Sequence, residues 1–509
     1  MHLSTLKKAA IWITLLSLVL KLSGLLRESI VSRVFGASDA TDGYVYAFSL
    51  ITLVVAMVSG GFNNVFLPMF SKEKKADAAK ADRNANGIMN WTVLFFAGLS
   101  VAGFFLVPYI IPLITPESMS AGAEDVAIRT MRIFLVAMAA VALNGILESY
   151  LQGRRTFVPA QISKISATLM GAVFALLFSN EWGIYSLAYG FVFGTVLGIL
   201  VQFFFLLRRG FAWSPSMKVD REFSKSFIVL IIPALLNSVV GQINMFVNKT
   251  FALGTVEGGA TYLDKASLLV SIPNTIYATT IVAIIFTLLS EQVDNKKKFQ
   301  DTMHMGMQIS LVTLLPIAVG LFLVGEEALA FIYEGGAFTA ADTHNTYIAM
   351  VLYLPMIVAQ GLQYIVSKSM YARGLTAVVF RISVTTVALN FIINWLIVDS
   401  LGYRGLAVTS SVVAVYFLVV STIVMYRDFD KSESKRLFGL IVRVIPPTLL
   451  MALPIYALKH FTPLGGLPDV VQLVLFAGLG AVIYAVGLYI FYREAFTKLL
   501  GLVKRKKKA

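Results

Sequence analysis

The sequence predicts an all-α polytopic membrane protein with about fourteen transmembrane helices, arranged as two six-helix lobes in parallel repeat plus two further C-terminal helices. Three observations support this class. Hydrophobic residues make up 58% of the 509 positions, which is more apolar surface than a soluble domain can bury. These residues form continuous runs of roughly 20, the length that a helix needs to cross a bilayer. The loops between the runs alternate between basic and neutral.

The apolar runs are continuous rather than alternating, so they indicate helices and exclude a closed β-barrel. The predicted membrane segments lie at residues 8–30, 43–70, 87–113, 126–151, 157–179, 183–207, 225–252, 263–289, 304–325, 346–371, 376–398, 404–425, 437–458 and 470–492.

Every second loop is basic, and this pattern predicts the topology. The basic set runs from Lys7-Lys8 to the tail at residues 504–508, whereas residues 115–125, 179–182 and 254–262 hold no such cluster. Short loops rich in Lys and Arg stay in the cytoplasm. Both termini are therefore predicted to be cytoplasmic, which requires an even number of spans. The basic tail is expected to lie against anionic lipid headgroups.

A faint internal repeat predicts the domain organisation. The matching pairs are TFVPAQIS at 156–163 with TAVVFRIS at 376–383, and WGIYSLA at 182–188 with LGYRGLA at 401–407. Both copies follow basic loops, so the repeat is parallel, with an axis along the membrane normal. We expect an N-terminal lobe at 1–210, a C-terminal lobe at 211–430, and a final helix pair with its basic tail at 431–509.

Composition and motifs argue against several classes. Cysteine is absent and the four histidines are scattered, so neither disulfides nor a metal site is expected. The net charge of +14 reflects the basic loops and does not indicate a nucleic-acid partner. No phosphate-binding loop or hydrolase motif occurs. The sequence therefore gives no positive sign of an enzyme or of a bound cofactor.

Charged side chains inside the predicted helices are the candidate functional residues. Lys21, Arg27 and Glu28 lie in the first helix, and Lys249 lies in the seventh. A charge in a membrane segment costs about 3 kcal/mol, so it usually faces a wet cavity or a partner. Cations outnumber anions in this set, and a cavity so lined would suit a phosphate or diphosphate. Alternatively, Arg27 and Glu28 pair near the interface while Lys21 reaches the headgroups.

Several segments resemble the MurJ (MviN) family of lipid II flippases, in the MOP exporter superfamily. The matching segments are 23–28, 33–38, 41–44, 60–68, 242–251, 263–273, 338–342 and 371–373. The resemblance implies two lobes around a central cationic cavity, and an apolar groove for a polyprenyl tail on the last two helices. Arg27 and Glu28 fall on the family's functional Arg-acidic pair.

The chain departs from the family pattern at two places. The second helix has no arginine at 52–57, and the eighth helix has Lys265 near the position of another family arginine. Lysine supplies a point charge there but not a bidentate fork. The predicted substrate-binding residues are Lys21, Arg27, Glu28, Asp42, Asn248, Lys249, Lys265 and Arg373.

The resemblance implies a transporter of the bacterial inner membrane rather than an enzyme. It would move undecaprenyl-diphosphate-linked lipid II to the outer leaflet by alternating access, as a monomer, with membrane lipids and the cell-wall synthesis machinery as partners. No cofactor is expected, and the membrane potential or a monovalent cation would supply energy. The alternatives are a flippase for another polyprenyl-diphosphate-linked saccharide, a multidrug–cation antiporter, and a glycosyltransferase using the loop carboxylates Glu326, Glu327 and Glu334.

Overall fold

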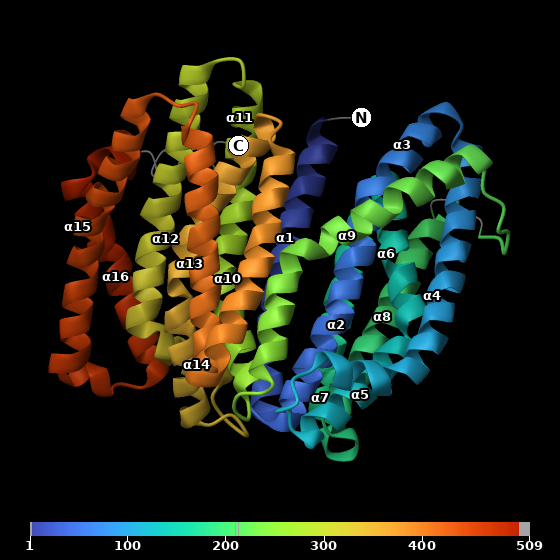
Figure 1. Cartoon of the computed structure of the whole chain (residues 1–509), viewed down its shortest axis with the longest axis horizontal. Helices are drawn as coiled ribbons and strands as arrows, with labels where there is room; N and C mark the ends of the chain where they lie inside the picture. The colour runs from blue at the N-terminus through green and yellow to red at the C-terminus, as the bar shows by residue number, and fades with distance from the viewer. Residues whose placement is uncertain (1–2, 209, 212, 498–509) are drawn as a thin grey trace. The chain divides into compact units, whose positions relative to one another are not determined.

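The structure, a computed structural model, describes residues 3–208, 210–211 and 213–497, and within these ranges it contains helices and no strand (Figure 1). The first helices are α1 (Leu3–Phe35), α2 (Asp39–Gly61), the π-helical segment η1 (Phe62–Phe66), α3 (Leu67–Ala76), α4 (Ala78–Ile114), α5 (Ala121–Val136), α6 (Met138–Gly153), α7 (Val158–Trp182), α8 (Tyr185–Arg208) and α9 (Arg221–Ala252). Those that follow are α10 (Gly259–Tyr277), the π-helical segment η2 (Ala278–Val282), α11 (Ala283–Glu291), α12 (Lys296–Tyr333), α13 (Ala340–Ala372), α14 (Thr376–Tyr426), α15 (Lys431–Phe461), the 3₁₀ turn η3 (Pro463–Gly466) and α16 (Asp469–Phe491). The predicted all-α class is confirmed.

Among the described residues, nine helical stretches are long and apolar enough to cross a membrane. α5 and α6 meet at 53° and together make a tenth. The predicted segments all fall on helices, and α14 holds two of them, at 376–398 and 404–425. The chain is therefore a multi-pass membrane protein, while the number fourteen stays a prediction.

The chain forms two compact units. The first contains the residues up to Thr261 together with Gly335–Phe338, and the second contains Tyr262–Glu334 together with the residues from Thr339 onward. Helix α9 packs against α2 in the first unit. The predicted lobes, divided at residue 210, are defined by the internal repeat, whereas the two units are defined by contacts. The division at residue 210 stays a prediction.

Two backbone irregularities recur at matching points of the predicted repeat. Gly183 has φ 53° and ψ −141°, and Gly402, its counterpart in the second copy, has φ 56° and ψ −148°. Side chains with a Cβ rarely adopt this conformation, so glycine is the residue suited to it. Likewise, η1 follows α2 and η2 follows α10. These shared features support a parallel repeat.

In the first unit, a row of small residues lets α7 and α8 approach closely. Gly190, Gly194 and Gly198 lie on one face of α8, and a Cβ at any of them would collide with α7 atoms. Small residues with this spacing let membrane helices pack backbone to backbone. α7 in turn packs along α1. The glycine row thereby fixes the position of α7, the helix against which α1 packs.

The segment between α8 and α9 is bound to α4 by hydrogen bonds. The Asn86 side-chain amide donates to the Ser214 carbonyl at 2.7 Å, and Asn90 donates to the same oxygen at 2.8 Å. The Trp91 indole donates to the Met217 carbonyl at 3.0 Å. The segment ends at Asp220, where the Lys80 ammonium, 2.7 Å away, holds the pKa of the carboxyl below its usual range.

Gly87→Ala is expected to loosen this segment. A Cβ at Gly87 would lie 2.5 Å from Val219 Cγ2 and 2.7 Å from the Lys218 carbonyl oxygen, so the backbone of the segment must shift. We expect faster limited proteolysis between α8 and α9 and a lower unfolding temperature in detergent. Gly98→Ala on the same helix is the matched control, because nothing lies within 4 Å of its Cβ. Equal proteolysis of the two variants would contradict the close packing.

In the second unit, α15 and α16 pack on α12 beside a break in that helix. Val324 is non-helical, with φ −126° and ψ 17°. Such a break separates the preceding carbonyls from their N–H partners. The Tyr347 hydroxyl donates to the Phe322 carbonyl at 2.6 Å, and Lys459 Nζ donates to the Leu323 carbonyl at 2.8 Å. Side chains of α13 and α15 thus donate hydrogen bonds to the two carbonyls before the break.

Lys459 also forms an ion pair with Glu327 at 2.5 Å. The two side chains are 18% and 8% exposed. Apolar side chains surround this end of α12, with Leu323 and Val324 packed in one cluster with Ile455 of α15. The ion pair therefore links α15 to α12 in a largely apolar environment.

Candidate functional site

Six of the eight predicted site residues lie in the first unit. Lys21, Arg27 and Glu28 come from α1, Asp42 from α2, and Asn248 and Lys249 from α9. α2 packs against α9, and Tyr44 of α2 contacts Arg27 of α1. The unit thus gathers most of the predicted charge around one helix, α2.

Arg27 is held by aromatic groups as well as by a carboxylate. Arg27 is only 9% exposed. Nη2 donates to the Tyr44 hydroxyl at 3.2 Å, and Cζ lies 4.1 Å from the centre of the Phe48 ring. Glu28 Oε1 is 3.4 Å from Nη2. This long ion pair, aided by an aromatic face and a hydroxyl, keeps a cation within a set of apolar helices.

The other α1 cation, Lys21, has a different environment. Its side chain is exposed, six residues before Arg27. In a membrane protein, exposure of this kind means contact with lipid, headgroups or a water-filled space. A lysine can extend its ammonium from such a position toward water. The role of Lys21 in substrate binding stays a prediction.

Lys249 approaches α2 from α9. Its Nζ donates to the Ser49 hydroxyl at 2.8 Å, and its neighbour Asn248 is buried. Ser49 directly follows Phe48, so the two cations contact adjacent residues of α2. Adjacent helix positions point roughly 100° apart, which places Arg27 and Lys249 around α2 rather than side by side.

Asp42 connects the first turns of two helices. Its Oδ1 accepts hydrogen bonds from the Thr261 backbone N–H at 2.9 Å and from the Thr261 hydroxyl at 2.6 Å. Asp42 is buried at the start of α2, and Thr261 stands in the first turn of α10. In this structure the carboxylate joins the α2 and α10 ends.

Lys265 and Arg373 belong to the second unit. Lys265 is 0% exposed, and its ammonium lies 5.6 Å from the centre of the Tyr333 ring. Arg373 caps the end of α13 and pairs with Asp428 at 3.0 Å. A wholly enclosed ammonium has no opening to a headgroup in this conformation, so substrate contact by Lys265 requires α10 or its neighbours to move. Both assignments stay predictions.

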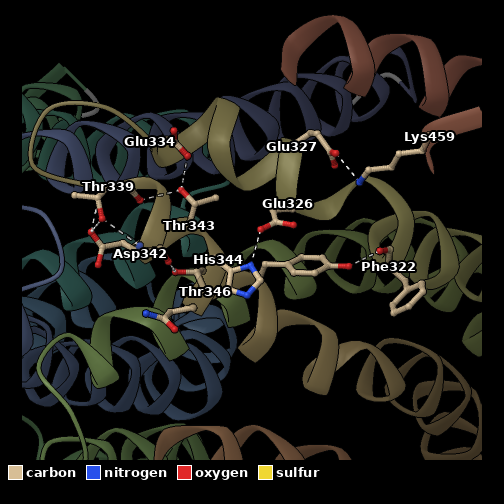
Figure 2. Close-up of polar contacts among 12 residues, drawn as sticks. Phe322, Glu326, Glu327, Glu334, Thr339, Asp342, Thr343, His344, Thr346 and Lys459 are labelled. Carbon is tan, nitrogen blue, oxygen red and sulfur yellow. Dashed lines mark hydrogen bonds and ion pairs between the residues drawn. The ribbon is translucent and has the colours of Figure 1, made fainter. Parts of the chain in front are cut away.

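The carboxylates considered for a glycosyltransferase each contact a different partner. Glu326 and Glu327, expected in a loop, lie in α12, because that helix continues past its break to Tyr333. They bond to separate partners, His344 at 2.8 Å and Lys459, while Glu334 accepts from Thr343 (Figure 2). Each carboxylate therefore has a structural contact of its own.

Sequence reasoning missed Tyr44, Phe48, Ser49 and Thr261, which contact the predicted residues. Tyr44 and Phe48 are four apart on α2, a spacing that places two aromatic rings on one helix face. That spacing was the available signal, but aromatic residues are common in membrane helices. Only the contact of the Arg27 side chain with α2 shows which ring lies under a cation.

No group of three or more His, Cys, Asp or Glu side chains in the described ranges could hold a metal ion. The arrangement instead offers N–H donors. A guanidinium and an ammonium can each bind a phosphate oxygen through charge-assisted hydrogen bonds. The model that describes the lipid II flippase MurJ matches this chain over residues 31–476.

The chain belongs to the lipid II flippase MurJ family. The Buchnera aphidicola (Acyrthosiphon pisum) probable lipid II flippase MurJ is 24% identical, over 89% of this chain and 90% of its own length. The Burkholderia cenocepacia lipid II flippase MurJ is 24% identical over 80% of this chain and 81% of its own. MurJ is a transporter family, and membership indicates a multi-pass protein of the bacterial inner membrane.

Solved structures show the same fold. A lipid II flippase MurJ in an inward closed conformation matches with a TM-score of 0.81 and 21% identity, over 95% of this chain and 99% of that one. An inward-facing multidrug transporter of the MATE family, in the MOP superfamily, matches with a TM-score of 0.70 and 13% identity, over 85% and 98%. The MurJ fold therefore extends over nearly the whole chain.

Proposed function

We propose that this protein is a flippase that moves lipid II, the undecaprenyl-diphosphate-linked peptidoglycan precursor, from the inner to the outer leaflet by alternating access. The observation that carries the proposal is the MurJ family match over residues 31–476. The buried Arg27 with its aromatic contacts supports it, since a diphosphate is the part of lipid II that a guanidinium binds best.

The predicted binding residues have distinct roles in this proposal. Arg27, Lys249, Lys21 and Lys265 hold the diphosphate and sugar headgroup, with Arg27 as the bidentate donor. Glu28 holds Arg27 when the site is empty, and at 3.4 Å it is a weak enough partner for a phosphate to replace. The remaining proposed substrate-binding residues are Asp42 at the start of α2, Asn248 near the end of α9 and Arg373 at the end of α13.

The polyprenyl tail is proposed to stay in lipid along α15 and α16. Phe438 and Leu453 of α15, and Val474 and Ile490 of α16, are exposed apolar side chains. Burying apolar surface against an isoprenoid chain or against lipid is equally favourable, so the tail can slide along this pair while the headgroup crosses.

Orientation, energy source and assembly complete the proposal. The alternation of basic and neutral loops supports cytoplasmic termini. Moving one unit charge through the membrane potential is worth about 2.3 kcal/mol per 100 mV, so the potential or a monovalent cation gradient can drive a cycle in which a dianionic headgroup moves. We propose a monomeric transporter that supplies the cell-wall synthesis machinery.

Depletion and complementation test the function directly. Cells that lack their own lipid II flippase receive this gene, and lipid II at the outer face is measured with an impermeant probe. We expect restored growth and restored probe access. Growth failure combined with rescue of another polyprenyl-diphosphate-linked saccharide export would replace lipid II with that substrate. Failure of both, at normal protein abundance in the membrane, would overturn the proposal.

A further inference from the structure

We propose that Phe48 is a positioning residue for Arg27. Its ring supports the guanidinium from one face and, unlike a carboxylate, does not itself accept hydrogen bonds from the N–H edge that a phosphate would use. This inference rests on the proposed function, and it deepens that function by assigning a role to an aromatic side chain outside the predicted site.

The Phe48 ring is fixed by other aromatic rings of the first unit. The Tyr44 ring stacks on it with centroids 5.7 Å apart and planes 14° apart. Phe191 of α8 meets it edge-on at 5.6 Å, and Phe134 of α5 lies 6.0 Å away. A ring held on several sides cannot turn freely, so the guanidinium above it has a defined platform.

The type of contact matters for a transporter site. A buried cation needs compensation for lost hydration. A carboxylate close to the guanidinium would supply it, but would use the same N–H groups that a phosphate needs. An aromatic face stabilises the charge through its quadrupole and accepts no hydrogen bond in the guanidinium plane. Phe48, 4.1 Å from Cζ, thus stabilises Arg27 without competing for ligand contacts.

Two further contacts of Arg27 are consistent with this division. The Tyr44 hydroxyl accepts one N–H bond at 3.2 Å, and the Glu28 carboxylate is 3.4 Å away. Both distances are long for charge-assisted bonds, which usually measure about 2.8 Å. The ring therefore adds a stabilising contact that neither of these groups supplies. Phe48 is only half-buried, so its surroundings are not closed to a ligand.

The experiment varies the ring's electrostatics while keeping its size nearly constant. Phenylalanines bearing one, two and three fluorines are placed at position 48, and undecaprenyl diphosphate is titrated onto the purified full-length protein in detergent, with binding followed by native mass spectrometry. Fluorination weakens the ring quadrupole in steps. We expect affinity to fall stepwise to about tenfold below wild type, in keeping with a desolvated cation–π contact.

Controls separate electrostatics from packing. The same fluorinated series at Phe66, a fully buried ring of the first unit that stacks on Phe70, is expected to bind like wild type. Phe48→Tyr is expected to stay within about twofold, and Phe48→Leu to bind about as weakly as the trifluorinated ring.

The possible results distinguish the two proposals. A stepwise loss at position 48 alone supports the positioning role. Equal affinity across that series, with wild type binding normally, overturns the role and leaves the flippase function standing. If wild-type protein does not bind undecaprenyl diphosphate at all, the proposed function is contradicted before the ring is considered.

Discussion

Arg27→Ala is expected to abolish lipid II translocation. The change removes a guanidinium able to give two charge-assisted hydrogen bonds to a phosphate, each worth about 1.5–3 kcal/mol. The loss corresponds to at least about a hundredfold in headgroup binding. The measurement is outer-face lipid II in the depletion strain, with protein abundance in the membrane measured in parallel.

Two further variants sharpen the test of Arg27. Arg27→Lys keeps the charge but not the fork, so partial activity is expected. Arg129→Ala is the matched control, because Arg129 pairs with Asp125 on α5 and its side chain is 61% exposed. Full translocation by Arg27→Ala at normal abundance would remove this residue from the substrate site.

Glu327→Ala is expected to destabilise the protein by about 3–5 kcal/mol. The change leaves the Lys459 ammonium, 18% exposed, without its carboxylate among the apolar side chains where α15 meets α12. A largely buried ammonium that loses its directly bonded carboxylate is far less favourable than a buried pair. Thermal unfolding of purified protein in detergent, followed by tryptophan fluorescence, measures the effect as a lower midpoint.

The double variant Glu327→Leu with Lys459→Met is expected to recover most of that loss, because apolar residues can replace a buried pair at little cost. About 1 kcal/mol of loss should remain, since the Leu323 carbonyl then has no lysine donor. Lys296→Met is the control, because its pair with Asp430 is about as close, at 2.9 Å, but 59% and 60% exposed. Such surface pairs contribute about 0–1 kcal/mol. Equal destabilisation by Glu327→Ala and Lys296→Met would contradict the buried role.

The fold was largely predictable, because its strongest signals are local. Continuous apolar runs predict membrane helices, and the predicted segments fall on helices throughout. The short motif shared by 182–188 and 401–407 also marked a real backbone feature, since Gly183 and Gly402 adopt the same unusual conformation. The break in α12 at Val324 was not predicted, because its opened carbonyls are satisfied by side chains far along the chain.

The candidate site was predictable only as a set of residue types. Charge in an apolar run singled out Arg27 and Lys249 in the same way, and the family resemblance added Lys265. The structure distinguishes them: Arg27 lies over an aromatic ring, Lys249 contacts a hydroxyl, and Lys265 is fully enclosed. Their environments depend on which helices pack together, and a single sequence does not specify that packing.

The sequence by itself determined the membrane class, the positions of the helices and the surplus of cations within them, since hydrophobic run length and charge are properties of the chain alone. Only the tertiary structure decided which groups contact one another: the Phe48 ring with Arg27, the Thr261 donors with Asp42, and Lys459 with the Leu323 carbonyl at the break in α12. These contacts join residues on different helices. Because buried polar and charged groups are stable only when a partner compensates for lost hydration, each contact depends on which helices pack together.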